Sequence, residues 1–241
     1  MVMARRVLCL GIALLWACGQ GTGPELLPPY DGPLEAGQRE WTGYQPGSVD
    51  IFDLVGIVGG FTGEEAVVID MTTPGYYNSA LGTTLDGTDP MFLPAGASTS
   101  VPIYATGEPS LAAASAILGP WLTSQTMPPG PNWNGPMAIP AQWPVLHETA
   151  IIYSIVNPGP GSLRLTGSFG VDNGICVWVD GVFKFGVVAE GSWAVDEYPD
   201  IDLGVIGPGQ HFLQVLRSDH SVVAGYWIEV TAQATVGAFF K

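Results

Sequence analysis

The sequence predicts an all-β protein, namely an antiparallel β-sandwich of jelly-roll type with one short helix. Three observations predict this fold. Short apolar runs follow one another through residues 149–231, and turn signals close them at regular spacing. Glycine and proline are abundant, at 33 and 21 of 241 residues, and show no collagen period, as expected of a chain with many turns. Only residues 111–118, with the sequence LAAASAIL, have the pattern of a helix.

Residues 1–18 have the features of an export signal. Two adjacent arginines supply a basic start, and residues 7–16 form an apolar run that is too short to span a bilayer. The run ends in LWAC, which resembles the bacterial lipoprotein box apart from its tryptophan and predicts lipidation at Cys18. Two alternatives stay open, an ordinary signal peptide cut near Ala17 and a twin-arginine signal. All three predict an exported protein, either a cell-envelope or outer-surface lipoprotein or a secreted protein.

The chain is strongly acidic. Seven lysine and arginine residues stand against 22 aspartate and glutamate residues, a formal net charge of −15, and removal of residues 1–18 leaves 5 against 22. So few cations exclude a nucleic-acid surface, because such surfaces neutralise phosphates with lysine and arginine. The hydrophobic content of 47% excludes a disordered chain. With Cys18 lipidated, Cys176 has no partner for a disulfide, and its apolar neighbours predict a packed strand residue.

The chain divides into four predicted parts. Residues 1–18 are the signal, residues 19–48 a tether rich in glycine and proline, residues 49–235 a single sandwich domain, and residues 236–241 a short tail.

The first half of the domain has weak strand patterns. Apolar runs at residues 50–58 and 66–71 predict strands, whereas residues 72–104 are predicted as loop around the turn cluster LDGTDP. The helix at residues 111–118 begins after Glu-Pro-Ser and ends at Gly-Pro. Its larger apolar residues share one face, which predicts packing against a sheet.

The second half has the clearest strand patterns. Strands are predicted at residues 149–155, 162–169, 175–179, 182–185, 201–203, 212–216 and 226–231. Asp180-Gly181 is the strongest hairpin signal, because a type I′ turn needs positive φ at both positions.

The order of the strands predicts where the loops lie. In an antiparallel sandwich successive connections alternate between the two ends, so tight turns at residues 158–161, 180–181 and 207–209 share one end. The longer connections at residues 119–146, 170–174, 187–200 and 218–225 share the other. That end is predicted to gather aromatic and polar side chains, namely Trp133, Trp143, Asp172, Asn173, Trp193, Asp196, Glu197, Tyr198, Asp200, Asp219 and His220. Function on rigid sandwiches is usually carried by such loops.

The sequence contains no complete catalytic motif. Residues 147–151 begin like the zincin motif HExxH but have Ile where the second His belongs, and the three histidines lack metal-ligand spacing. No GxSxG elbow occurs. Asp219 beside His220 is a pattern that can orient an imidazole for base chemistry, but a turn-stabilising Asp with a surface His explains it better. We therefore expect no enzymatic activity.

A structural calcium ion is one predicted ligand. Asp196, Glu197 and Asp200 supply the hard oxygen ligands that Ca²⁺ prefers, close together in one predicted loop. No EF-hand loop is present, and solvated surface acids are the alternative.

Carbohydrate is the other predicted ligand. Sugars stack on aromatic faces, for which Trp133, Trp193 and Tyr198 are of the right type. Their hydroxyl groups bond polar side chains, for which we name Asp172, Asn173, Asp219 and His220. The alternative for each tryptophan is a place in the core.

An ordered series of short motifs runs through the domain. It comprises Tyr76-Tyr77-Asn78, Leu85-Asp86-Gly87-Thr88, Glu108-Pro109-Ser110-Leu111, Gly119-Pro120-Trp121-Leu122, Pro140-x-x-Trp143, Glu148-Thr149-Ala150-Ile151-Ile152-Tyr153, Val171-Asp172-Asn173-Gly174, Val177-Trp178-Val179-Asp180-Gly181, Asp200-Ile201-Asp202-Leu203-Gly204, Leu216-Arg217-Ser218-Asp219-His220 and Gly225-Tyr226. Through these residues most of the chain resembles a family of secreted bacterial proteins with a galactose-binding-like β-sandwich, many of which carry a PEP-CTERM surface-sorting tail.

The resemblance implies the fold and export, and no particular activity. Two departures stand out. The C-terminal sequence GAFFK lacks the Pro-Glu-Pro motif and a membrane helix, which predicts no anchoring by such a tail. Ser218 and Ser221 replace the acid and the glycine expected beside Asp219-His220.

These observations predict an exported, non-catalytic surface module that binds carbohydrate through the loops at one end of the sandwich. The predicted partner is a glycan or another cell-surface component, and the membrane is contacted only through a lipid anchor. The alternative is a structural or adhesive cell-surface protein that makes protein–protein contacts and has no small-molecule ligand.

Overall fold

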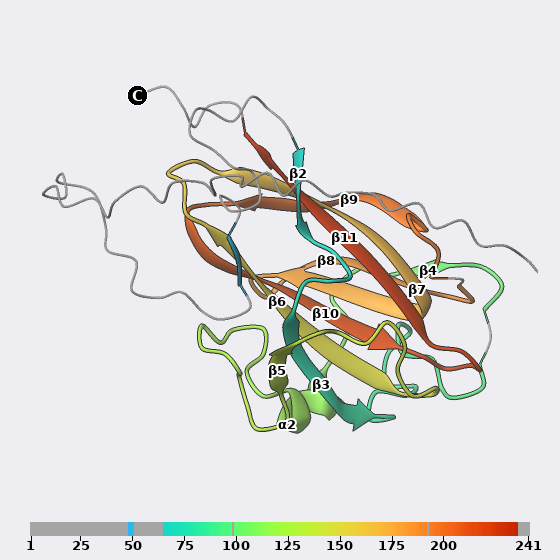
Figure 1. Ribbon diagram of the computed structural model, residues 1–241. Coiled ribbons are helices and arrows are strands. Elements are labelled where there is room, and N and C mark those ends of the chain that lie inside the picture. Colours follow the sequence, from blue (N-terminus) through green and yellow to red (C-terminus); the bar gives the residue numbers. More distant parts are fainter. Residues whose placement is uncertain (1–47, 51–64, 98, 192, 236–241) are drawn as a thin grey trace, which may run out of the picture. The chain divides into compact units, whose positions relative to one another are not determined.

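The computed structural model describes residues 48–50, 65–97, 99–191 and 193–235 (Figure 1). The elements are, in chain order, β1 (Ser48–Asp50), β2 (Glu65–Ile69), β3 (Gly75–Gly82), β4 (Ile103–Tyr104), the 3₁₀ turn η1 (Ala112–Ala114), α2 (Ser115–Leu118), β5 (Asn134–Met137), β6 (Glu148–Asn157), β7 (Leu163–Val179), β8 (Val182–Ala189), β9 (Tyr198–Ile206), β10 (Gly209–Ser218) and β11 (Gly225–Ala234). The predicted signal, the lipidation site, the tail and almost all of the tether lie outside the described residues, as does most of the strand predicted at residues 50–58.

The strands form two sheets that share β7, and the prediction of an antiparallel β-sandwich with one short helix is confirmed. The order in the larger sheet is β5-β3-β6-β10-β7-β8-β4, and in the smaller sheet it is β2-β11-β7-β9. Among the described strands only the pairing of β1 with β6 is parallel. The jelly-roll detail stays a prediction.

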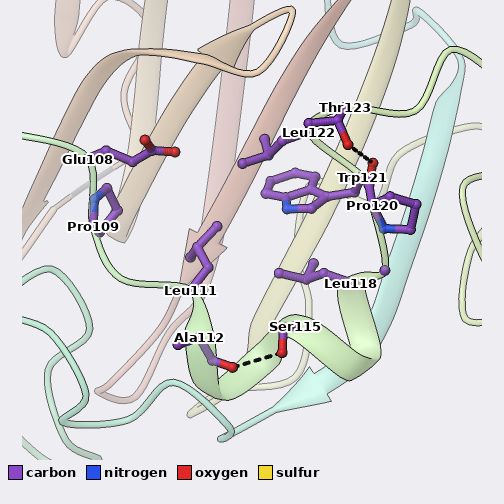
Figure 2. A pocket seen from close by; sticks show the side chains of 11 residues that line it. Glu108, Pro109, Leu111, Ala112, Ser115, Leu118, Pro120, Trp121, Leu122 and Thr123 are labelled. Carbon is purple, nitrogen blue, oxygen red and sulfur yellow. Dashed lines mark hydrogen bonds between the residues drawn. The ribbon is translucent and has the colours of Figure 1, made fainter.

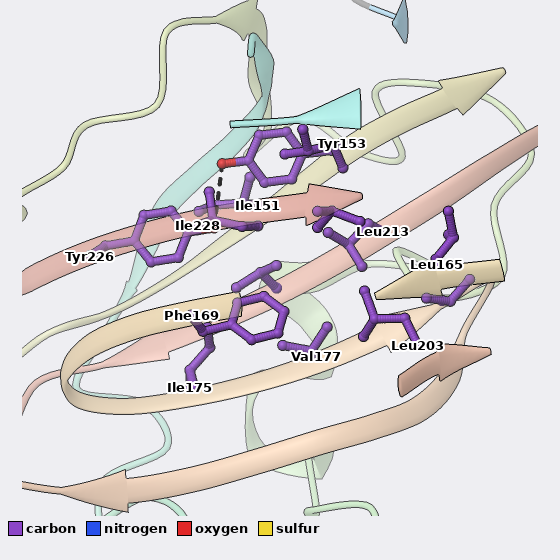
Figure 3. Packing of buried hydrophobic residues seen from close by; sticks show 14 of the residues in the cluster. Ile151, Tyr153, Leu165, Phe169, Ile175, Val177, Leu203, Leu213, Tyr226 and Ile228 are labelled. Atoms are coloured by element: carbon purple, nitrogen blue, oxygen red, sulfur yellow. Dashed lines mark hydrogen bonds between the residues drawn. The ribbon is translucent and has the colours of Figure 1, made fainter. Parts of the chain in front are cut away.

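β7 joins the two sheets by bending at residues 170–174. Its first half pairs with β11 and β9 in the smaller sheet, and its second half pairs with β10 and β8 in the larger one. Phe169 and Ile175 flank this bend in the core between the sheets (Figure 3). The sequence predicted two strands and a turn here. Residues 163–179 instead form one continuous strand. Its first half runs toward the loops at one end of the sandwich, and its second half runs back from them in the other sheet.

The register shows which connections share an end of the sandwich. Ser218 lies opposite Glu148 and Gly174 in the larger sheet, and Gly225 lies opposite Asp172 in the smaller sheet. The bend of β7, the β10–β11 connection and the start of β6 therefore meet at one end, which we call the loop end. The β8–β9 connection also reaches it, because β8 ends beside the bend of β7 and β9 begins opposite Phe169.

The opposite end carries the tight turns, as predicted. Asp180 and Gly181 have φ values of 50° and 74°, as a type I′ turn requires. One expectation about the loops is wrong. Residues 119–146 are not confined to the loop end, because the carbonyl of Leu122 packs against Gly181 at the opposite end. This segment is long enough to cross the sheet, and it does so.

The core between the sheets is built from alternate residues of their facing strands. Ile151 and Tyr153 of β6 and Val177 of β7 meet Leu203 and Ile228 of the smaller sheet, and all five are almost fully buried (Figure 3). Period-2 alternation directs these side chains to one face of each strand. The alternation that predicted the strand at residues 162–169 therefore reflects this core.

A second core covers the outer face of the larger sheet, and we call it the outer layer. Leu85, Phe92, Leu118, Trp121 and Trp133 come from α2 and the segments on either side of it and pack there. They meet apolar side chains of β6, β7 and β10. Residues 111–118 do pack against a sheet as predicted, but as the turn η1 followed by the single turn α2.

The outer layer explains why β3 was predicted as loop. Tyr76 packs into the outer layer, whereas its neighbour Tyr77 packs into the core between the sheets. A strand that is buried on both faces shows no alternation of apolar and polar residues. Cys176 of β7 lies in the outer layer as a buried free thiol, as expected. No helix within the described ranges is long and apolar enough to cross a membrane.

Candidate functional site

Hydrogen bonds tie three loops together at the loop end. The backbone N–H of Leu146 donates to Oδ2 of Asp219 at 2.5 Å, and the N–H of Asp219 donates to the carbonyl of His147 at 3.2 Å. The N–H of His220 donates to Oδ1 of Asn173 at 3.0 Å. Polar side chains that are far apart in the sequence thus meet here, as the order of the strands predicted.

Asp172 and Asn173 form the bend of β7. Nδ2 of Asn173 donates to Oδ1 of Asp172 at 2.5 Å, and both side chains are largely buried. Burial raises the pKa of Asp172 to about 6, and the charges of Asp219 and Glu197 act in the same direction. The Asp172 carboxyl therefore holds a proton more readily than an ordinary aspartate does.

Trp193 is a half-buried indole held in a slot made by two glycines. A Cβ atom on Gly225 would overlap the Trp193 ring, and one on Gly170 would overlap the backbone of Trp193 and Ala194. Gly170 and Gly225 alternate with the core residues Phe169, Val171 and Tyr226, so both glycines lie on the outer face of the smaller sheet, and the indole lies against that face. Trp193 is thus positioned on the backbone of Gly225, the strand partner of Asp172.

Replacing Gly225 with alanine is expected to displace the Trp193 ring. The unfolding free energy is expected to fall by about 1–3 kcal/mol, the usual cost of overpacking a filled site, and Trp fluorescence is expected to shift to the red. The matched control is Gly207→Ala, because a Cβ there meets no atom within 4 Å. Equal urea midpoints for the two variants would show that the slot does not hold the indole.

An aromatic row runs from the loop end to the edge of the larger sheet. Glu197 accepts a hydrogen bond from the N–H of Val171 at 3.3 Å, and the buried ring of Tyr198 follows it. Burial raises the pKa of Tyr198 to about 12. The ring of Tyr104 on β4 lies 6.4 Å from that of Tyr198, at 89°, and its side chain is 56% exposed. Sequence reasoning missed Tyr104, because its segment carries no strand pattern.

Asp219 and His220 are placed differently from the prediction. Both side chains are only 1% exposed, so neither presents its polar atoms to solvent. Among the described residues, Oδ1 of Asp219 and both ring nitrogens of His220 lack a hydrogen-bond partner. Burial lowers the pKa of His220, which favours a neutral ring. These two residues connect the loops through their backbone and through the second Asp219 oxygen.

The structure does not bring Trp133 to the loop end. Its ring is 5% exposed, stacks on Trp121 at 5.8 Å between centroids, and donates from Nε1 to the carbonyl of Leu118 at 3.0 Å. The prediction of a stacking role for Trp133 is therefore corrected, since both its face and its N–H are used inside the outer layer. Trp143 is also buried, with Nε1 donating to the carbonyl of His147.

The three predicted calcium ligands are not arranged as a site. Asp196 and Asp200 are exposed, and Glu197 turns inward to the backbone of β7. Nowhere in the described part of the chain do three or more His, Cys, Asp or Glu side chains form a group that could hold a metal ion. Calcium binding stays a prediction that this arrangement does not support.

Sequence reasoning also missed a buried arginine below the loop end. Arg217 is fully buried, and its Cζ lies 4.3 Å from the ring centroid of Trp143 and 4.7 Å from that of Tyr226. Nη1 donates to the carbonyl of Pro140 at 2.8 Å, and Nε donates to Oγ1 of Thr149 at 3.1 Å. An arginine at the end of an apolar strand run was the only signal, and it did not reveal the partners.

Glu148 is a second buried ionisable group that the sequence did not reveal. Its side chain is 1% exposed at the start of β6 and faces the outer layer. Burial raises its pKa to about 8, and a hydrogen bond to Asp86 and the charge of Asp86 add to the effect. The carboxyl of Glu148 is therefore largely protonated at neutral pH.

Comparison with family models, curated proteins and solved structures finds no match to this chain.

Proposed function

We propose that this protein is an exported, non-catalytic surface module that binds carbohydrate at the loop end of its sandwich. The observation that carries the proposal is the half-buried indole of Trp193, which lies in its glycine slot against Gly225, the strand partner of Asp172. A sugar needs an apolar face to stack on and polar groups at the edge of that face to bond its hydroxyls.

Rigidity favours this use of Trp193. Its ring lies against Gly225, so little side-chain entropy is lost when a ligand covers it. The acidic surroundings favour a neutral or basic glycan over an anionic one, because like charges repel.

The proposal includes no catalytic step. One oxygen of Asp172 accepts from Asn173 and one oxygen of Glu197 accepts from the N–H of Val171, so both carboxyl groups are fixed against the bend of β7. An acid and a base that act on a glycosidic bond both need free access to it. Export, by a signal peptide with or without lipid on Cys18, remains part of the proposal and is inferred from the sequence.

Trp193→Ala is expected to weaken glycan binding at least tenfold, because buried aromatic anchors dominate such interfaces. The measurement is a glycan array with the purified full chain, followed by titration of the best glycan. The control is Val182→Ala, an exposed apolar truncation next to the turn at the opposite end. Near-UV circular dichroism shows whether each variant keeps its fold. No glycan binding by the wild type, or unchanged affinity in Trp193→Ala, would contradict the proposal.

A second candidate function rests on exposed valines at the same end. Val195, Val222 and Val223 are 63%, 82% and 38% exposed on the β8–β9 and β10–β11 connections, and Val145 is exposed just before β6. Exposed apolar residues that gather on neighbouring loops favour protein–protein contacts. Val195→Ser with Val222→Ser would abolish adhesion to a partner protein and leave glycan binding unchanged. Trp193→Ala therefore tests glycan binding, and Val195→Ser with Val222→Ser tests the protein–protein contact.

A further inference from the structure

A pocket opens in the outer layer, remote from the predicted site. It has a volume of about 340 Å³, within the range of small-molecule sites, and lies between Glu108, the turn of α2 and residues 119–123 (Figure 2). Leu111, Leu118 and Leu122 provide apolar walls. Residues 119–123 line the pocket, and the Leu122 carbonyl packs against Gly181. The pocket is therefore near the end of the sandwich that carries the tight turns.

The pocket has a rigid aromatic floor. Trp121 is 2% exposed and is fixed by Trp133, which stacks on it, and by Trp178, whose ring centroid lies 5.4 Å away in an edge-on arrangement. Nε1 of Trp178 donates to Oε1 of Glu108 at 2.8 Å. Trp178, which packs against the floor, therefore positions the carboxylate of Glu108 at the rim of the pocket.

The polar side chains of the pocket offer acceptors. The hydroxyl of Ser115 donates to the carbonyl of Ala112 at 2.9 Å, and that of Thr123 donates to the carbonyl of Pro120 at 3.4 Å (Figure 2). Each hydroxyl hydrogen is thus used within the protein. Glu108 adds a carboxylate, so the side chains that line the pocket present oxygen acceptors and one negative charge.

The charge of Glu108 is not balanced by a cationic side chain among the described residues. Arg164 pairs with Asp202, Lys184 lies against Gly204 on β9, and Arg217 is enclosed between the sheets. A ligand that enters the pocket therefore gains most if it supplies the cation itself.

We infer that this pocket binds a small free amine, namely an ammonium group on an aromatic or aliphatic body. The body fills the space between the leucine walls above Trp121, and the ammonium group donates to Glu108 at the rim. Neutral molecules of the same shape lose the charge-assisted bond, and carboxylates are repelled. This site is independent of the proposed glycan site, because the two lie at different ends of the sandwich.

The test is a titration of the full chain with three probes of one shape, read by tryptophan fluorescence and by ligand-observed NMR. The probes are 2-phenylethylammonium, the neutral 2-phenylethanol and the anionic 3-phenylpropanoate. We expect saturable binding of the ammonium probe with Kd on the order of 1 mM or tighter, about tenfold weaker binding of the alcohol and none of the carboxylate.

Glu108→Gln isolates the charge. The glutamine oxygen can still accept from Trp178, and only the negative charge is lost, so binding of the ammonium probe is expected to weaken about tenfold. Glu229→Gln on β11 is the matched control and should bind like the wild type. Ala112→Phe, which fills the exposed rim, is expected to abolish binding of every probe. Absence of saturable binding, equal affinities for ammonium and alcohol, or an unchanged Glu108→Gln variant overturns the inference.

Discussion

Arg217→Ala is expected to lower the free energy of unfolding by about 3–5 kcal/mol, the largest effect of any single truncation that we predict. The guanidinium is fully buried between the rings of Trp143 and Tyr226, with Tyr77 5.6 Å away on the same cation. Truncation removes this desolvated cation–π contact and leaves a cavity in its place. It also leaves Oγ1 of Thr149 and the carbonyl of Pro140 without their donor.

Two further variants separate the contributions of Arg217. Arg217→Met keeps most of the volume and loses the charge, and it is expected to cost about 1–2 kcal/mol, because apolar replacement of a buried ion is well tolerated. Arg164→Ala, in an exposed ion pair with Asp202, is the control and should change stability by less than about 1 kcal/mol. Urea unfolding followed by circular dichroism measures all three. Similar losses for Arg217→Ala and Arg164→Ala would show that the aromatic cage does not stabilise the fold.

The second large effect is a loss of stability with rising pH that depends on Glu148. Its pKa is about 8 in the folded protein against an ordinary value of 4.5. Between these two values the folded state holds a proton that the unfolded state has released, so stability falls as the pH rises. The contribution is fully present below pH 4.5 and is lost as the pH passes through 8.

The wild type is expected to lose about 2 kcal/mol of unfolding free energy between about pH 6 and about pH 8.5 through Glu148. Glu148→Gln is expected to remove most of this dependence, because the amide stays neutral and can still bond Asp86. His211, whose pKa is raised by its hydrogen bond to Asp180, adds a slope of the same sign that the substitution leaves in place. The difference between the two pH profiles therefore isolates Glu148, and parallel profiles would contradict its assignment.

Local patterns predicted the parts of the fold that one face dominates. The first half of β7 and most of β11 alternate buried and more exposed residues, and Asp180-Gly181 has the residues that a type I′ turn requires. β3 was missed because Tyr76 and Tyr77 enter two different cores. β4 and β5 were missed because two and four mostly exposed residues leave no periodic signal.

The candidate site was predicted in part. The order of the strands was enough to bring Asp172, Trp193 and Asp219 to one end. It was not enough to tell which side chains reach solvent, and Trp133 and His220 are buried although their neighbours in the sequence are polar or small. The exposed Tyr104 and the pocket beside α2 had no sequence signal, because both depend on segments that meet only in the folded chain.

The sequence by itself determined the fold class, the acidic character and the Asp180-Gly181 hairpin, and it is the basis on which export is proposed. These properties depend on residue counts, on alternation along single strands and on backbone preferences at single turns, all of which are local. Only the tertiary structure decided that β7 serves two sheets, that an outer layer makes a second core, and that Arg217 is enclosed by aromatic rings. These features arise from contacts between residues far apart in the chain, and the burial of each side chain depends on what packs against it.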